Sequence, residues 1–175
     1  MLVGIVSDSH DNVPMLRRAV DHFNADGCEL VIHAGDVVAP FAMAVMDGLK
    51  CPFRAIYGNN DGEKVGLKIK AASVGGSIEE PPVQFMAGGL KFRVFHDCSD
   101  WETEAKESGA DVVIFGHTHD TSIETLSGNE LPLGINPGEC GGWLTGSCTA
   151  AILDTTTRQV RIIDLRLEPG KRIDG

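Results

Sequence analysis

The sequence predicts an α/β fold, because strand-like and helix-like segments alternate along its first half. Three short apolar runs are each followed by an amphipathic segment before Ala72, and strand-like segments dominate the second half. Side chains that can bind ions follow several of the predicted strands. Because the carboxyl ends of parallel strands share one edge of a sheet, these side chains are expected to meet there.

The first half of the chain consists of predicted strand–helix pairs. Asp11 and Asn12 can cap the first helix, Pro14 fits its first turn, and Gly27 closes it. The strands are apolar runs that end in turn residues, as expected for buried strands. In chain order the predicted elements are a strand over 2–7, a helix up to Gly27, a strand over 29–34, a helix over 40–49, a strand over 53–57 and a helix from Asp61 to about Ala72.

The second half is predicted to contain mostly strands. A hairpin across Gly88-Gly89 is followed by one helix and another buried strand. A single domain is expected over residues 1–168, with a frayed tail over 169–175. The predicted elements are the hairpin strands 82–86 and 90–95, a helix over 101–108, a strand over 111–115, and strand-like segments around Ile123 and over 131–135, 147–154 and 159–165.

The composition favours a globular protein in the cytoplasm. The chain has 175 residues, and its apolar runs are shorter than the roughly 18 residues that a membrane helix needs. The first apolar stretch ends at Val6, too early for a signal peptide. The five cysteines are scattered without a Cys-x-x-Cys pair, which predicts reduced thiols. A net charge of −10 argues against nucleic acid polymers as the main partner.

Four short motifs carry the chemistry, and each follows a predicted strand. Their carboxylate and imidazole groups suit Mn, Fe, Ni or Zn better than Ca or Mg alone. Glycines in these motifs let the backbone turn sharply enough to aim a side chain at an ion. The motifs are Asp8-Ser9-His10, Gly35-Asp36, Gly58-Asn59-Asn60-Asp61 and Gly116-His117-Thr118-His119.

In this order and spacing, the motifs resemble the calcineurin-like metallophosphoesterase superfamily, specifically its short bacterial and archaeal phosphodiesterase branch. The resemblance extends over essentially the whole chain, to the Asn136-Pro137-Gly138 turn. It implies a four-layer α/β/β/α sandwich of two mixed sheets flanked by helices, with metals at one sheet edge. It also implies a homodimer or a higher homo-oligomer.

The resemblance implies a centre of two divalent metal ions, Mn²⁺ first, with Ni²⁺, Fe²⁺ or Zn²⁺ as alternatives. Asp8, His10 and His119 would hold one ion, and Asp36 would bridge both. The second ion would be held by Asn59, His96 and His117. At His96 the chain departs from the family, which usually has His-Gly-His where this sequence reads His96-Asp97-Cys98.

Two cations at such a centre suit hydrolysis of a phosphate ester. Held roughly 3.5–4 Å apart, they can share an oxygen ligand, lower the pKa of a bridging water and bind the nonbridging phosphate oxygens. A metal-bound hydroxide would then attack phosphorus in line with the departing oxygen. A small phosphodiester is the expected substrate.

Asn60 is the most consequential departure from the family. Most relatives have His there, which is thought to stabilise the transition state or protonate the leaving oxygen, although the short phosphodiesterase branch often lacks it and commonly has Cys instead. The Asn amide has no titratable proton, and general acid catalysis contributes about 10²–10⁴-fold. The hypothesis is a preference for good leaving groups or another acid. Asp97 is the nearby candidate, although neighbouring cations would hold it ionised.

Three functions other than a phosphodiesterase are alternatives for this fold or site. A phosphomonoesterase would differ only around the second phosphate oxygen. A protein-interaction scaffold, for which the retromer subunit of this fold is the precedent, is favoured by the missing histidine at Asn60. The complete ligand set favours an enzyme, since such groups are costly to bury without a metal. A nuclease is less favoured, because the acidic chain offers no basic groove.

Several further residues have more than one interpretation. Asp61 can contact the site or cap the following helix. His33 is expected to be a buried, hydrogen-bonded core histidine, and His22 is expected on the polar face of the first helix. Trp101 and Trp143 can shape a substrate pocket or a dimer interface, with ordinary packing as the default.

Overall fold

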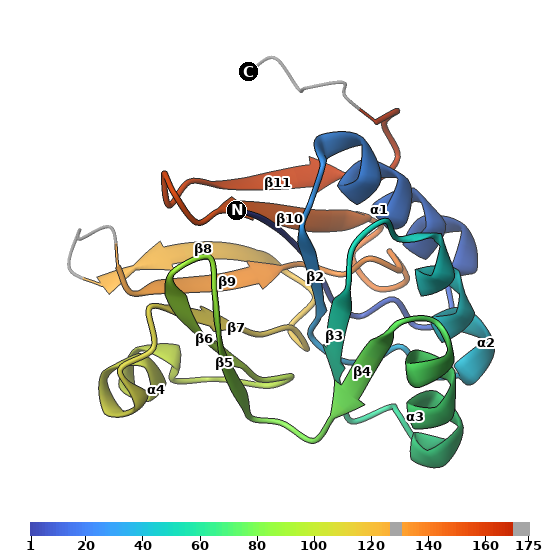
Figure 1. Ribbon diagram of the computed structural model, residues 1–175, viewed down its shortest axis with the longest axis horizontal. Helices are drawn as coiled ribbons and strands as arrows, with labels where there is room; N and C mark the ends of the chain where they lie inside the picture. The colour runs from blue at the N-terminus through green and yellow to red at the C-terminus, as the bar shows by residue number, and fades with distance from the viewer. Residues whose placement is uncertain (127–130, 170–175) are drawn as a thin grey trace.

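The computed structural model describes residues 1–126 and 131–169 (Figure 1). In chain order its elements are β1 (Leu2–Val6), α1 (Val13–Asp26), β2 (Leu30–His33), α2 (Pro40–Met43), the 3₁₀ helix η1 (Ala44–Gly48), β3 (Phe53–Ile56), α3 (Lys64–Ser73), β4 (Gly76–Glu79), β5 (Val83–Ala87), β6 (Leu90–Val94), α4 (Trp101–Ser108), β7 (Val112–Ile114), β8 (Thr121–Thr125), β9 (Leu133–Pro137), β10 (Thr149–Asp154) and β11 (Val160–Asp164).

The strands form two mixed sheets. The first has the order β11-β10-β1-β2-β3-β4, in which β1 to β4 are parallel and β10 runs antiparallel to β1. The second has the order β5-β6-β7-β9-β8, with β6, β7 and β9 parallel and the two edge strands antiparallel. Each sheet therefore gathers the carboxyl ends of its parallel strands at one edge.

The two sheets pack face to face between layers of helices (Figure 1). One apolar core lies between the first sheet and α1, α2, η1 and α3, and a second lies between the sheets. A third, smaller core packs α4 against the second sheet, because Val113 and Phe115 point away from their neighbours Val112 and Ile114. This α/β/β/α sandwich confirms the predicted fold class.

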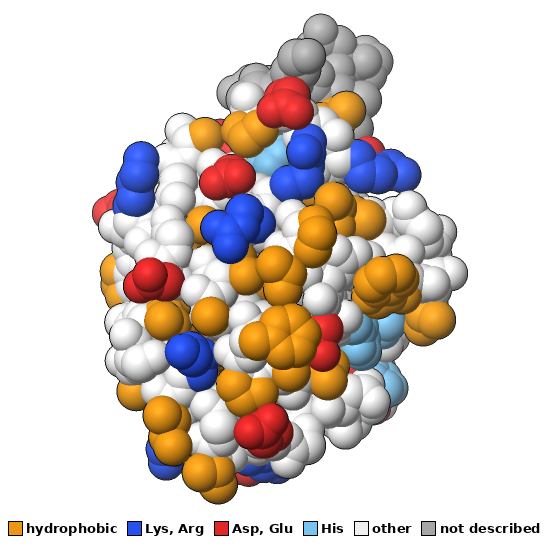
Figure 2. Space-filling view, turned by 90° about the vertical axis from the view of Figure 1, so that its right-hand side faces the viewer, with side chains coloured by type: hydrophobic (Ala, Val, Ile, Leu, Met, Phe, Trp, Pro, Cys, Tyr) orange, Lys and Arg blue, Asp and Glu red, His pale blue; other side chains and the backbone are white. Residues whose placement is uncertain are grey.

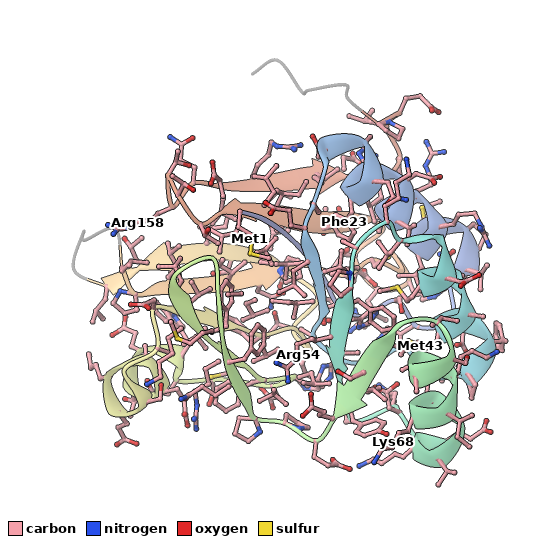
Figure 3. The ribbon with its side chains drawn as sticks, viewed as in Figure 1. Met1, Phe23, Met43, Arg54, Lys68 and Arg158 are labelled. Atoms are coloured by element: carbon pink, nitrogen blue, oxygen red, sulfur yellow. The ribbon has the colours of Figure 1, made fainter. Side chains whose placement is uncertain are left out.

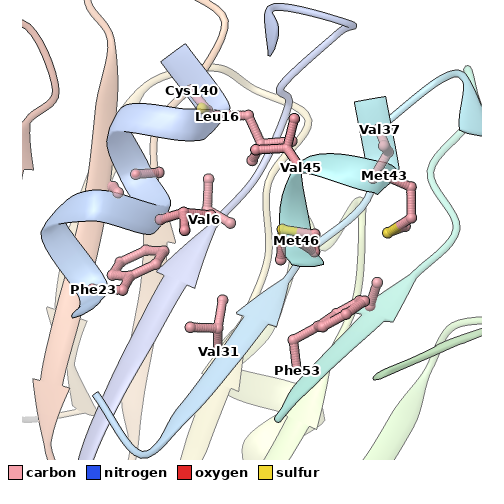
Figure 4. Packing of buried hydrophobic residues seen from close by; sticks show 14 of the residues in the cluster. Val6, Leu16, Phe23, Val31, Val37, Met43, Val45, Met46, Phe53 and Cys140 are labelled. Carbon is pink, nitrogen blue, oxygen red and sulfur yellow. The ribbon is translucent and has the colours of Figure 1, made fainter. Parts of the chain in front are cut away.

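Helix α1 begins and ends as its sequence predicts. The Asn12 side chain accepts a hydrogen bond from the Met15 N–H, and Gly27 takes the left-handed conformation that ends the helix. Phe23 on this helix packs directly on β1, where a Cβ atom at Gly4 would lie 2.7 Å from the Phe23 ring. Figures 3 and 4 show Phe23 on the helix-covered face of the first sheet.

The second helix is shorter than predicted. Residues 40–49 were expected to be one α-helix, but the α-helical part ends at Met43 and continues as 3₁₀ helix to Gly48. Met43 and Met46 are both buried and lie three residues apart, which matches the three-residue turn of a 3₁₀ helix. Both methionines belong to the apolar core between this segment and the first sheet (Figure 4).

One further expectation was wrong, one strand was not predicted, and most of the predicted tail lies outside the described residues. His22 is not on an exposed polar face, because its side chain is buried and its Nε2 lies 3.1 Å from the Leu167 carbonyl oxygen. The segment after β11 crosses α1 and covers this histidine. The sequence did not predict β4, a four-residue edge strand whose one buried apolar side chain is Ile78. None of the described helices is long and apolar enough to cross a membrane.

Replacing Phe23 by Ala is expected to lower the free energy of unfolding by about 3–5 kcal/mol, because it leaves a cavity over β1. Phe41→Ala is the matched control: its side chain is 62% exposed, so a change below about 0.5 kcal/mol is expected. Urea unfolding of both variants measures the difference. Similar losses in the two variants would contradict this description of the core.

Candidate metal centre

The nine residues singled out as metal or catalytic candidates lie in loops after β1, β2, β3, β6 and β7. These loops come from the carboxyl ends of parallel strands in both sheets and meet where the sheets adjoin. Backbone hydrogen bonds join them: the Asp8 N–H donates to the Gly35 carbonyl, and the Gly116 N–H donates to the His96 carbonyl. The expected convergence of distant segments is therefore found.

Five of these residues form two overlapping groups with the spacing of metal ligands. Asp8, His10 and His119 form one group, and Asp8, Asp36 and His96 form the other. The ligand atoms within each group all lie within 4.8 Å of one another. Asp8 is common to both groups, although the resemblance implied that Asp36 would be the shared residue.

The two carboxylates lie among the imidazoles. Asp8 Oδ1 lies 3.5 Å from His119 Nε2 and 3.8 Å from His10 Nε2. Asp36 Oδ2 lies 3.3 Å from His96 Nε2 and 3.6 Å from His10 Nε2. His10 therefore lies close to both carboxylates, so the two groups form one continuous centre.

The hydrogen bonding of this centre fits a bound cation. Asp8 Oδ1 and His10 Nε2 are both buried, and neither has a hydrogen-bond partner. Burying such polar atoms without a partner is unfavourable, and a cation would supply one. Carboxylate oxygens together with imidazole nitrogens suit borderline divalent metals such as Mn, Fe, Ni and Zn.

The backbone is strained at the same residues. Eight non-glycine residues in the described part of the chain have positive φ, and five of them are candidate ligands. Such conformations cost about 1–3 kcal/mol each and collect at functional sites. They indicate that the loops are shaped to aim these side chains rather than to minimise local energy. The five are Asp8 (φ 52°), His10 (41°), Asp36 (59°), His117 (67°) and His119 (67°).

Asn60 holds the Asp36 carboxylate on both oxygens. Its backbone N–H donates to Asp36 Oδ1 at 2.8 Å, and its side-chain amide donates to Oδ2 at 2.7 Å. Burial favours the neutral form of Asp36, but the contacts with His96 and Asn60 outweigh it and hold the Asp36 pKa well below its usual value. The only side-chain donor group of Asn60 is thus engaged with Asp36.

His96 is fixed by its other nitrogen. Its Nδ1 lies 2.9 Å from the Ala34 carbonyl oxygen, which can only accept, so Nδ1 carries the proton. Nε2 is then directed at Asn59 Oδ1, 2.9 Å away, and at Asp36. Burial lowers the pKa of His96, but the Asp36 carboxylate reverses this and raises it. His96 and Asn59 therefore face the centre, despite the unusual sequence that follows His96.

His117 and Asp97 lie at the rim. The ring of His117 is 5.2 Å from that of His96, and its side chain is 43% exposed. Its Nε2 lies 3.9 Å from an oxygen of Asp97, whose side chain is 65% exposed. The backbone N–H of His117 donates to Asp8 Oδ2 at 3.0 Å, which ties this loop to the first sheet.

Comparison with known proteins identifies the family. Residues 1–158 match the calcineurin-like phosphoesterase superfamily domain. The chain belongs to this superfamily. It is 40% identical to a phosphodiesterase from Methanocaldococcus jannaschii over 94% of its own length and 99% of that protein. It is 32% identical to a probable metallophosphoesterase from Methanothermobacter thermautotrophicus, over 79% of this chain and 76% of that one.

Solved structures agree with this assignment of the phosphoesterase fold. A structure described as a novel archaeal phosphodiesterase superposes with a TM-score of 0.85 at 39% identity, covering 94% of this chain and 99% of that chain. The phosphoesterase Yfce from E. coli has a TM-score of 0.61 at 18% identity, covering 94% and 100%. Zinc-bound Vps29 from Entamoeba histolytica has a TM-score of 0.62 at 16% identity, covering 94% and 99%. The last two share the fold alone.

Asp61 holds together two loops that carry candidate metal ligands. Its buried carboxylate accepts hydrogen bonds from the N–H groups of Asp36 (3.0 Å), Val38 (2.6 Å) and Gly58 (2.7 Å). Burial raises the Asp61 pKa against the effect of these donors. Asp61 does not cap α3, whose N-cap residue is Glu63. Asp61 thus joins the loop after β2 to the loop after β3.

Glu139 is a supporting residue that the sequence analysis missed. It is fully buried, and its Oε2 lies 3.1 Å from His119 Nδ1. A carboxylate accepts at this nitrogen, which leaves Nε2 of His119 directed toward Asp8. Burial favours neutral Glu139, but hydrogen bonds led by those from Thr145 outweigh it and lower its pKa. Its position directly after the Asn136-Pro137-Gly138 turn was the available signal.

His33 is the buried core histidine that its position in the strand predicted. Its Nε2 lies 3.1 Å from Ser9 Oγ, and burial lowers its pKa to about 3. His33 is therefore neutral at physiological pH, and its role is in the packing of β2.

Two cavities adjoin the centre, and both are lined by Asn59 and His117. Figure 2 shows histidine side chains at the surface beside hydrophobic ones. One cavity, of about 360 Å³, is also lined by His10, Asp36, Asn60, His119, Trp143 and Leu144. The other, of about 420 Å³, is also lined by Tyr57, Gly58, Lys64, Glu80, Pro81, Pro82, Phe95, His96 and Asp97.

Replacing Asp61 by Ala is expected to lower the free energy of unfolding by at least about 2 kcal/mol, because backbone N–H groups in two loops lose their acceptor. Glu63→Ala is the control, with an expected change below about 0.5 kcal/mol. Urea unfolding measures both. Equal losses would mean that Asp61 acts on the start of α3 rather than on the two loops.

Proposed function

We propose that this phosphoesterase is a metal-dependent phosphodiesterase that hydrolyses small diesters. Asp8, His10 and His119 would hold one divalent cation. Asn59, His96 and His117 would hold a second cation, and Asp36 would contribute to both. The observation that carries the proposal is the pair of buried, unpartnered atoms Asp8 Oδ1 and His10 Nε2 inside a ring of imidazoles. The 40% identical phosphodiesterase from Methanocaldococcus jannaschii supports the substrate class.

The residues of this chain prepare the centre before any substrate arrives. The Ala34 carbonyl and Glu139 each accept from the Nδ1 atom of a histidine, which leaves Nε2 of His96 and His119 facing the carboxylates. Contacts with His96 and then Asn60 outweigh the effect of burial and lower the Asp36 pKa, which keeps Asp36 ionised, and Asn60 also fixes its position. The bound cations, with Mn²⁺ as the first choice, supply Lewis acidity toward the phosphate and activate water.

The charges around the cavities favour a phosphodiester over a phosphomonoester. Lys64 is the one Lys or Arg among the described lining residues of the two cavities, and its Nζ already lies 2.9 Å from Glu80 Oε1. A monoester dianion carries one more negative charge than a diester, and these walls offer little to compensate it. Two cavities that adjoin at Asn59 and His117 also suit a phosphate with two ester groups.

Metal-stripped protein is expected to be inactive and to regain cleavage of bis-p-nitrophenyl phosphate when Mn²⁺ is added, well above its cleavage of p-nitrophenyl phosphate. Adding Ni²⁺, Zn²⁺ or Mg²⁺ in parallel ranks the metals. Asp36→Asn should reduce kcat/KM at least about 100-fold, because a neutral ligand binds the cation less well. The exposed Asp47→Asn serves as the matched control.

Inactivity with every metal, despite stoichiometric metal binding, would refute the proposal and favour a protein-interaction scaffold. Preference for the monoester would refute the diester assignment alone.

Turnover of aryl phosphodiesters is expected to fall steeply as the pKa of the leaving phenol rises. The Asn60 amide has no titratable proton to transfer and donates a hydrogen bond to Asp36, so the acid contribution of about 10²–10⁴-fold is missing. The slope of log kcat against leaving-group pKa measures this. A flat dependence would show that another group, with Asp97 the first candidate, protonates the leaving oxygen.

A further inference from the structure

Trp143 and Leu144 form an exposed apolar wall beside the candidate metal centre. Their side chains are 65% and 78% exposed, yet both line the cavity that contains His10 and His119. Large apolar side chains exposed next to polar groups that face the same cavity are a feature of ligand sites. The proposed metal chemistry makes no use of either residue.

This wall is held in place by hydrogen bonds from its own backbone and ring. The Trp143 indole Nε1 donates to the His10 carbonyl oxygen at 3.1 Å, and the Trp143 N–H donates to Glu139 Oε2 at 2.9 Å. The Leu144 N–H donates to Glu139 Oε1 at 3.1 Å. The indole ring therefore stands at a fixed position relative to His10.

Glu139 connects this wall to the centre. The same carboxylate that accepts from Trp143 and Leu144 also contacts His119 Nδ1 at 3.1 Å. One buried group thus sets the position of a candidate ligand and of the apolar wall. The distance between a phosphate held at the centre and the apolar wall would therefore be fixed. A fixed distance is what selection of the ester group on that phosphate requires.

The chemistry of the cavity indicates what it accepts. None of its described lining residues is a Lys or Arg, so it offers no partner for a second phosphate group. Its volume of about 360 Å³ is within the usual range for small-molecule sites. An indole face beside an aliphatic side chain suits a flat, uncharged ring, which gains stacking and burial of apolar surface.

We propose that Trp143 and Leu144 form the subsite that selects an aromatic ester group, an aryl ring or a nucleobase-bearing group, on the phosphodiester substrate. This inference rests on the proposed function, because the phosphate must be held at the adjacent centre. The other ester group then lies on the side of the second cavity, which begins at Asn59 and His117.

Binding of phenylphosphonate and methylphosphonate tests the subsite without hydrolysis, since neither contains an ester bond. Calorimetric titration of Mn²⁺-loaded protein is expected to show phenylphosphonate binding about tenfold more tightly, the size of one stacking contact. Trp143→Ala should bring this ratio close to one, and Leu144→Ala should reduce it in part. Met86→Ala, which removes another exposed apolar side chain (65%) that lines neither cavity, should leave it unchanged.

Kinetics separate this inference from the proposed function. The subsite is assigned to the ester group that stays on phosphorus, so the leaving p-nitrophenyl group lies outside it in both substrates. In Trp143→Ala, kcat/KM for bis-p-nitrophenyl phosphate should therefore fall about tenfold more than that for the diester with one methyl group and one p-nitrophenyl group. Equal falls, or an unchanged phosphonate ratio, would overturn the subsite even if diester cleavage persists. A wild-type protein that prefers phenylphosphonate but cleaves no diester would refute the function alone.

The apolar wall has one further possible occupant, a second copy of the chain. Light scattering of the wild type and of Trp143→Ala distinguishes the two. A dimer that dissociates in the variant, with an unchanged phosphonate ratio, would assign the wall to subunit contact and overturn the subsite.

Discussion

The burial of two ionisable carboxylates at the junction of the sheets is the constraint on which the rest of the centre depends. Asp8 and Asp36 are at most 1% exposed, and an isolated buried carboxylate costs several kcal/mol. In the described part of the chain, their ionic contacts within 4.0 Å are imidazoles. Asn60 and the His117 backbone compensate part of the charge. A Cβ at Gly58 would overlap Asp36 Oδ1, so the close approach of these loops needs glycine there.

The same contacts also join the two sheets. Asp8 belongs to the loop after β1 in the first sheet, yet its Oδ2 accepts from the His117 N–H in the second. His96 of the second sheet is bound to the Ala34 carbonyl of the first. The apolar core between the sheets is non-directional, whereas these polar contacts fix which strand ends face each other. The same hydrogen bonds therefore shape the candidate site and align the two sheets with each other.

The sequence predicted the fold class and the convergence of its motifs because both depend on local patterns. Apolar runs marked the strands, and Asp8, Asp36 and His117 each follow one. The hydrogen-bond partners of Asp61 and Glu139 could not be predicted from local patterns, since they include backbone N–H groups whose directions exist only in the folded loops. His22 was misassigned for a related reason: a segment more than 140 residues away covers it. Which ligands hold which ion stays a prediction.

The left-handed backbone conformation at the candidate ligands costs stability at the residues that the proposed function needs. At Asp8, His10, Asp36, His117 and His119, glycine would relieve strain of about 1–3 kcal/mol per residue, at the cost of a coordinating group. A lineage that no longer used the centre would gain stability by accepting such replacements. The five side chains thus stand at positions where the backbone conformation alone would favour glycine, so any gain from them must come from what they bind.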